Sequence, residues 1–205
     1  YERASATQCA ASCAQILDVG MQPLITVRDA AQCAELPPGT LVEFWNEGDL
    51  NGFTKQHLMD MWHVIDVCDA RGLKCYVGAS PSGLHYRGFQ LLKQFPWASI
   101  PKHVGCSIHR YGEGTPNVIT KWGAPWYTFG RTQPIPWKFR TDEVHHLFNL
   151  IGERPLAVTE FGYCSAHFPA EIQAQFVKQE REFWSAYAEV LCIYQALDGP
   201  SNVCE

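Results

Sequence analysis

Two glutamates are the residues of this chain best placed for catalysis. Glu47 ends the run LVEFWNE and Glu160 ends the run LAVTE, and each is followed by Gly or by a turn that contains Gly. Apolar runs of this kind are typical of buried strands, so both carboxyl groups are expected at strand ends. Two carboxyl groups on separate strands can break a glycosidic bond, because one protonates the leaving oxygen while the other attacks the anomeric carbon or activates water.

Structural explanations also exist for these acids. An acid directly after a strand is favoured at the start of a helix by the helix dipole, but Trp45 and Asn46 beside Glu47 favour the catalytic interpretation. Glu43 precedes Glu47 by four residues, on the same side of an alternating strand. Glu43 is either a second pocket carboxylate or, as we favour, an interior acid paired with a base such as Arg28.

The elements that would position these residues alternate along the chain. Six apolar or β-branched runs predict strands at 23–27, 40–45, 73–78, 103–109, 155–161 and 190–196. Amphipathic stretches predict helices at 4–17, 54–71, 141–151 and 170–188. Thr54 and Thr141 are the expected N-caps, and Gly20, Gly72 and Gly152 stand where helices should end.

This alternation predicts a parallel sheet covered by helices, either an open doubly wound sheet or a closed barrel. Neither GxGxxG nor GxxxxGK[ST] occurs, which disfavours a nucleotide-binding open sheet. Polar and aromatic residues follow nearly every predicted strand, and function at the carboxyl ends of parallel strands is typical of barrel enzymes. We therefore expect one (β/α)-barrel catalytic domain over residues 1–205.

The motifs WNE (45–47), HRY (109–111) and TEFG (159–162) together resemble the clan A glycoside hydrolases. These are (β/α)8 barrel enzymes that retain the anomeric configuration. The resemblance implies that Glu47 closes the fourth strand as the acid/base and that Glu160 closes the seventh as the nucleophile. It also implies that His109 and Tyr111 contact the reacting sugar and the nucleophile, and that Asn46 bonds the sugar 2-hydroxyl.

Aromatic residues complete the predicted substrate site. Tyr194 occupies the eighth-strand position where the clan usually has a Trp as the floor of the reacting-sugar subsite. Trp45, Trp122 and Trp126 are also predicted to bind substrate. Trp122 and Trp126 belong to a long loop, 111–139, whose rings form either a sugar-stacking platform or a small hydrophobic core of their own.

The chain departs from the clan pattern at its start. Counting back from Glu47 makes 23–27 the third strand, so the first two strands are missing and a small barrel, incomplete at its N-terminus, is predicted. The clan arginine near the end of the second strand has no matched position, and Arg28 is a loose substitute for it.

Composition restricts the partners. The chain has 205 residues, 18% of them charged, and a net charge of −5, so bulk electrostatics would not hold a nucleic acid. No stretch reaches the roughly 20 apolar residues that span a bilayer. The start without Met and without a signal pattern fits either a mature secreted form or a segment of an intracellular parent sequence, and both remain open.

Nine cysteines occur without a CxxC pair, and we expect most of them to be buried thiols. Disulfides that involve Cys9, Cys13, Cys33 or Cys204 stay open if the protein is secreted. The histidines show neither HxxxH nor HExxH spacing, so no metal site and no cofactor are predicted.

The leading hypothesis is a retaining glycosidase that cleaves β-glycosidic bonds of an oligo- or polysaccharide with Glu47 and Glu160 about 5 Å apart. Two alternatives remain: a carbohydrate-binding barrel that has lost turnover, and an unrelated barrel hydrolase, for example a metal-dependent one.

Overall fold

The computed structural model of the protein describes residues 5–45, 53–79, 90–112, 137–163 and 170–193. The predicted loop 111–139 falls mostly outside these ranges, as do the predicted strand residues beyond 193. Among the placed residues, no helix is both long and apolar enough to cross a membrane.

Six parallel strands form one sheet: β1 (Leu24–Val27), β2 (Leu41–Phe44), β3 (Lys74–Val77), β4 (Gly105–Gly112), β5 (Leu156–Tyr163) and β6 (Val190–Ile193). Their order in the sheet is their order in the chain. A doubly wound sheet reverses its strand order and carries helices on both faces, whereas this consecutive order is that of a barrel. All six predicted strands are thus confirmed, and so is the barrel-type fold, which is a curled half-barrel.

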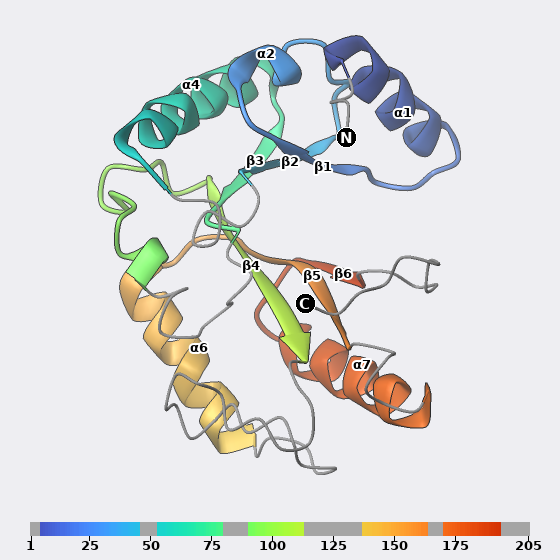
Figure 1. Cartoon of the computed structure of the whole chain (residues 1–205), viewed down its shortest axis with the longest axis vertical. Helices are drawn as coiled ribbons and strands as arrows, with labels where there is room; N and C mark the ends of the chain where they lie inside the picture. Colours follow the sequence, from blue (N-terminus) through green and yellow to red (C-terminus); the bar gives the residue numbers. More distant parts are fainter. Residues whose placement is uncertain (1–4, 46–52, 80–89, 113–136, 164–169, 194–205) are drawn as a thin grey trace.

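Helices cover the outside of the sheet (Figure 1). They are α1 (Ala6–Asp18), α2 (Ala30–Cys33), α4 (Lys55–Arg71), α6 (Trp137–Ile151) and α7 (Ala170–Trp184). The first three lie along β1 to β3, while α6 and α7 flank β4 to β6. In α4 the buried residues Met61, Val64, Ile65 and Cys68 recur at helical spacing, which explains why this face packs on the sheet.

The helix boundaries follow local signals at most ends. Thr54 precedes α4 with an extended backbone, and its N–H donates to His57 Nδ1 at 2.9 Å. Gly20, Gly72 and Gly152 all have positive φ, as expected of residues that end helices. The prediction of Thr141 as an N-cap is wrong, because α6 already begins at Trp137.

Two further boundaries differ from expectation. The last predicted helix ends at Trp184, four residues before Ala188, and a turn follows it. The short helix α2 was not expected, although the Asp29 side chain accepts from the N–H of Gln32 as an N-cap. Four residues are too few for a periodic pattern, so only the cap could have indicated this helix.

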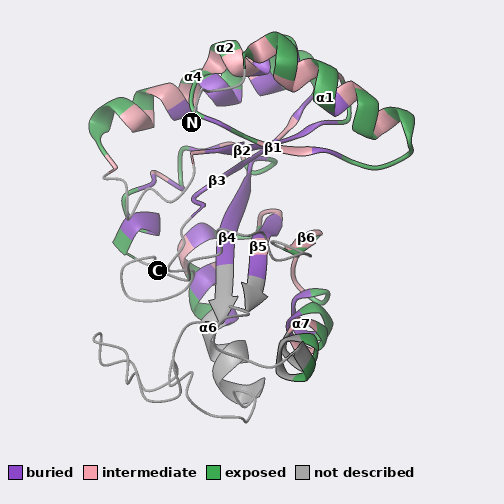
Figure 2. Cartoon of the chain, turned by 45° about the vertical axis from the view of Figure 1, so that its right-hand side comes forward, coloured by how far each residue is buried: buried purple, intermediate pink, exposed green. Residues whose placement is uncertain are grey.

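The sheet buries a separate set of residues on each face. Val42, Val77, Ile108 and Val158 pack outward in the large core beneath the helices. On the inner face, Leu41, Tyr76 and Ala157 form a second cluster, with Leu24 and Val190 packed against it. Figure 2 shows that the described parts of the central strands are buried while the outer side of α1 and α4 is exposed.

The described cysteines agree with the prediction of buried thiols. Seven are free, and five of these are buried: Cys13, Cys33, Cys68, Cys75 and Cys106. No disulfide is present among the described residues. Cys164 and Cys204 lie outside them.

Candidate active site

Glu160 and His109 lie side by side on neighbouring strands. They are direct partners in the register of β5 and β4. His109 Nδ1 is 3.5 Å from Glu160 Oε2; the His109 side chain is fully buried, whereas that of Glu160 is 19% exposed. Glu160 is therefore the member of the pair that a substrate could reach, and the imidazole supports it from behind.

A β-bulge brings Glu160 to this side of the sheet. Val158 pairs with Ile108 and Glu160 pairs with His109, so Thr159 is an extra residue on β5. In a regular strand successive side chains point to opposite faces, and Thr159 and Glu160 would be separated. A bulge re-aims the side chain that follows it, and bulges are common at barrel rims and active sites.

Glu43 occupies the same inner face and is 1% exposed. Its Oε2 accepts from the Thr26 hydroxyl at 3.1 Å, and its Oε1 accepts from the Thr159 hydroxyl at 2.5 Å. His109 Nε2 lies 3.8 Å from Glu43 Oε1. The expectation of an Arg28 partner is wrong: two hydroxyls and an imidazole surround this carboxylate.

These polar residues form a layer above the inner apolar cluster. Thr26, Glu43 and Thr159 each follow a member of that cluster by two residues, at Leu24, Leu41 and Ala157. Inward side chains recur every second residue, so on β1, β2 and β5 an apolar inward residue is followed by a polar one. The polar layer thus lies nearer the carboxyl ends of the strands.

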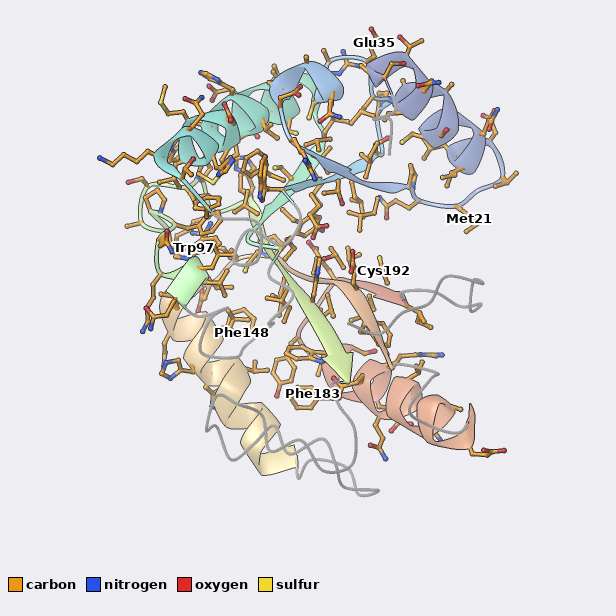
Figure 3. The ribbon with its side chains drawn as sticks, viewed as in Figure 1. Met21, Glu35, Trp97, Phe148, Phe183 and Cys192 are labelled. Carbon is orange, nitrogen blue, oxygen red and sulfur yellow. The ribbon has the colours of Figure 1, made fainter. Side chains whose placement is uncertain are left out.

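The electrostatic field of this layer reaches β6. Burial, and then the charges of Glu43 and Glu160, raise the pKa of the Cys192 thiol. Figure 3 shows Cys192 pointing into the space enclosed by the curled sheet. The carboxylates of Glu43 and Glu160 therefore both act on the same side chain, Cys192, in the interior of the curled sheet.

Arg28 instead lies over Trp45, with its guanidinium carbon 5.2 Å from the ring centroid. Trp45 directly follows β2 and has a φ of 60°, a left-handed conformation that is uncommon for a residue other than glycine. The backbone N–H of Trp45 donates to the Val27 carbonyl at 2.8 Å, and the centroid of its ring lies 3.9 Å from that of the His57 ring. The backbone therefore turns sharply at the first residue of the WNE motif.

The structure places only some of the predicted site residues. Glu160, His109 and Trp45 are described as above. The backbone of Tyr111 is in β4, but its side chain is not described. Five predicted residues lie outside the described ranges: Glu47, Asn46, Tyr194, Trp122 and Trp126.

Sequence reasoning missed the two threonines that hold Glu43. Thr159 belongs to the TEFG motif, and its interior position two residues after Ala157 was the available signal. Among the described residues, no three His, Cys, Asp or Glu side chains gather as a metal site would require.

Comparisons with known proteins were informative only at the level of structure. No protein-family model matches the sequence, and no curated protein matches it. A GH128 (subgroup II) endo-β-1,3-glucanase from Sorangium cellulosum is 18% identical over 90% of this chain and 73% of its own, with a TM-score of 0.58.

Two further solved structures are similar to this chain. Thermotoga maritima Cel5A, in complex with mannotriose, is 13% identical over 95% of this chain and 71% of its own, with a TM-score of 0.66. A GH128 (subgroup I) endo-β-1,3-glucanase from Amycolatopsis mediterranei is 14% identical over 95% of this chain and 86% of its own, with a TM-score of 0.50. The expected likeness to clan A glycoside hydrolases is thereby confirmed for the fold.

Proposed function

We propose that this chain is a retaining glycoside hydrolase and that residues 1–205 act as one catalytic barrel domain. The observation that carries the proposal is the partly exposed Glu160 carboxylate, supported by buried His109 in a barrel whose structural neighbours are glycosidases. The WNE motif adds Glu47 as the partner carboxyl group, directly beyond the sharp turn at Trp45.

The proposed reaction has two steps. Glu160 attacks the anomeric carbon and displaces the leaving oxygen, which takes a proton from the Glu47 carboxylic acid. Glu47, now a carboxylate, removes a proton from water, and that water attacks the anomeric carbon and releases Glu160. The buried side of the site contributes by holding Glu160 ionised and oriented.

The substrate class we propose is a β-glucan or a related β-linked polysaccharide. Two of the neighbours are described as endo-β-1,3-glucanases, and the third was crystallised with mannotriose. Asn46, Tyr111, Tyr194, Trp45, Trp122 and Trp126 are the proposed contacts to the sugar.

The test is hydrolysis of β-1,3-glucan, β-1,4-glucan and β-mannan, with the anomer of the first product recorded by NMR. We expect one of these to be cleaved with β product formed first. An α product first would refute the retaining mechanism. Binding of a glucan without any cleavage would favour the carbohydrate-binding alternative, and activity abolished by a chelator would favour a metal-dependent hydrolase.

A second experiment assigns the nucleophile. In a Glu160→Gly variant, azide can take the place of the lost carboxylate and attack an activated β-glycoside directly. We expect the α-glycosyl azide to form. A Glu189→Gln variant is a matched control, because Glu189 accepts from the Tyr76 hydroxyl at 2.7 Å near the opposite, amino ends of the strands.

A further inference from the structure

His109 lies between two carboxylates that come from different strands. Its Nδ1 is 3.5 Å from Glu160 Oε2, and its Nε2 is 3.8 Å from Glu43 Oε1. Both ring nitrogens therefore face an acceptor. A neutral imidazole carries only one N–H, and its other nitrogen would present a lone pair to a carboxylate, whereas the imidazolium has an N–H for each side.

The contacts of Glu43 match its ionised form. Each of its oxygens accepts a hydroxyl, from Thr26 on one side and from Thr159 on the other. An ionised carboxylate is an acceptor only, and such charge-assisted hydrogen bonds are the stronger kind. Because Glu43 is 1% exposed, water cannot replace these partners.

Two residues connect Glu43 to Glu160, because each contacts Glu43 and lies next to Glu160. One is His109, through its imidazole. The other is Thr159, which is the extra residue of the β5 bulge and directly precedes Glu160. The same carboxylate thus holds both the bulge that aims Glu160 and the ring that contacts it.

We propose that Glu43 is a positioning residue that keeps His109 as an imidazolium and orients Glu160 through His109 and Thr159. The role of Glu160 as nucleophile in this inference rests on the proposed function. The imidazolium leaves the three groups with one net negative charge in place of two adjacent ones. Its positive charge, with Nδ1 3.5 Å from Glu160 Oε2, favours the ionised carboxylate and keeps it aimed at the substrate.

Among the described residues, Glu43 also acts on two thiols of neighbouring strands. Glu43 acts on Cys106 of β4 and Cys192 of β6, and burial raises the pKa of both thiols, so they stay neutral. Among the described residues, Glu43 and Glu160 are the carboxylates that lie within 4 Å of the imidazole.

The first test needs no substrate. In ¹H–¹⁵N spectra of the side chain at about pH 7, we expect wild-type His109 to show a protected N–H on both ring nitrogens. Glu43→Gln should leave one, while the matched Glu189→Gln variant should keep both. A single N–H in the wild type would overturn the proposal, as would two unchanged N–H groups in Glu43→Gln. The wild-type spectrum decides the charge even if Glu43→Gln does not fold.

The second test is kinetic. We expect Glu43→Gln to lower kcat by on the order of 10- to 100-fold while KM changes by less than about 2-fold, because a misaimed nucleophile affects the transition state more than binding. An unchanged kcat, or an equal loss in Glu189→Gln, would contradict the positioning role. If the wild type cleaves no glycoside, the proposed function fails, and the spectra alone then decide the state of His109.

Discussion

Glu160 reaches the interior of the half-barrel only because β5 carries one residue more than either of its neighbours at this point. Val158 and Phe161 pair with Leu191 and Ile193 of β6, so two residues of β5 stand opposite one of β6. Phe161 returns to the outer core. The bulge therefore changes the direction of Glu160 and leaves the packing on both sides of it intact.

The activities of the Glu47→Gln and Glu160→Gln variants should depend differently on the leaving group of the substrate. Glu47→Gln removes the proposed general acid, whose catalysis is typically worth about 10²- to 10⁴-fold, but a substrate with a good leaving group needs little of it. Glu160→Gln removes the proposed nucleophile for every substrate. We expect aryl glycosides with acidic phenols to be cleaved by the first variant and not by the second. Equal losses for both variants on these substrates would refute the assigned roles.

Thr159→Val should destabilise the fold. It removes the hydroxyl that donates to Glu43 at 2.5 Å and leaves a buried carboxylate oxygen without that donor. The expected loss is about 1.5–3 kcal/mol in the free energy of unfolding, measured in urea. Thr159→Ser keeps the hydroxyl and is the matched control. A Val variant as stable as the Ser variant would show that this hydrogen bond contributes little.

At the scale of elements, β3 and β4 approach each other closely where Gly105 opens β4. A Cβ at Gly105 would overlap the ring of Tyr76, and it would lie 3.0 Å from the Pro155 carbonyl. Tyr76 is fully buried, and its hydroxyl is held by Glu189, so the ring has no free direction in which to move. This glycine is thus required by packing between strands.

Gly105→Ala should therefore cost about 1–3 kcal/mol of unfolding free energy, as overpacking usually does. In a Tyr76→Leu background the ring is absent, and the same substitution should cost clearly less, because the two sites are in contact. A double-mutant cycle in urea measures the difference. Additive effects would mean that Tyr76 is not what the new methyl group meets.

Across the whole molecule, buried thiols link stability to pH. Burial is the largest cause that raises the pKa of Cys106; the charge of Glu43 adds to it and Arg154 opposes it. The folded thiol stays protonated while the unfolded chain ionises near about pH 8.5. Above that pH the unfolded state binds fewer protons, so this contribution to stability is full below it and is lost as pH rises.

The free energy of unfolding in reductant should fall between about pH 8.5 and 10. Each such thiol contributes up to about 1.4 kcal/mol per pH unit. Cys106→Ala should have a shallower slope than the wild type, and Cys9→Ala, at a half-buried position, is the control. Parallel slopes for wild type and Cys106→Ala would show that Cys106 does not carry this dependence.

The six strands, most helix ends and the barrel class could be predicted from the sequence alone. These depend on local patterns, namely apolar runs, caps and glycines with positive φ, which each segment carries alone. The sequence also indicated Glu160 and His109 through short motifs at strand ends. Helix α2 could not be predicted, because a single turn has no period, and α6 starts at Trp137, four residues before the expected cap at Thr141.

The contacts among the interior polar side chains depend on strand pairing and could not be predicted from the sequence. Alternation along β5 predicts opposite faces for Thr159 and Glu160, and the bulge that places both inside depends on pairing with β4 and β6. The partners of Glu43 come from β1, β4 and β5, up to 116 residues away along the chain. Charge alone favoured Arg28 for Glu43, but the register of the strands places Thr26, Thr159 and His109 there.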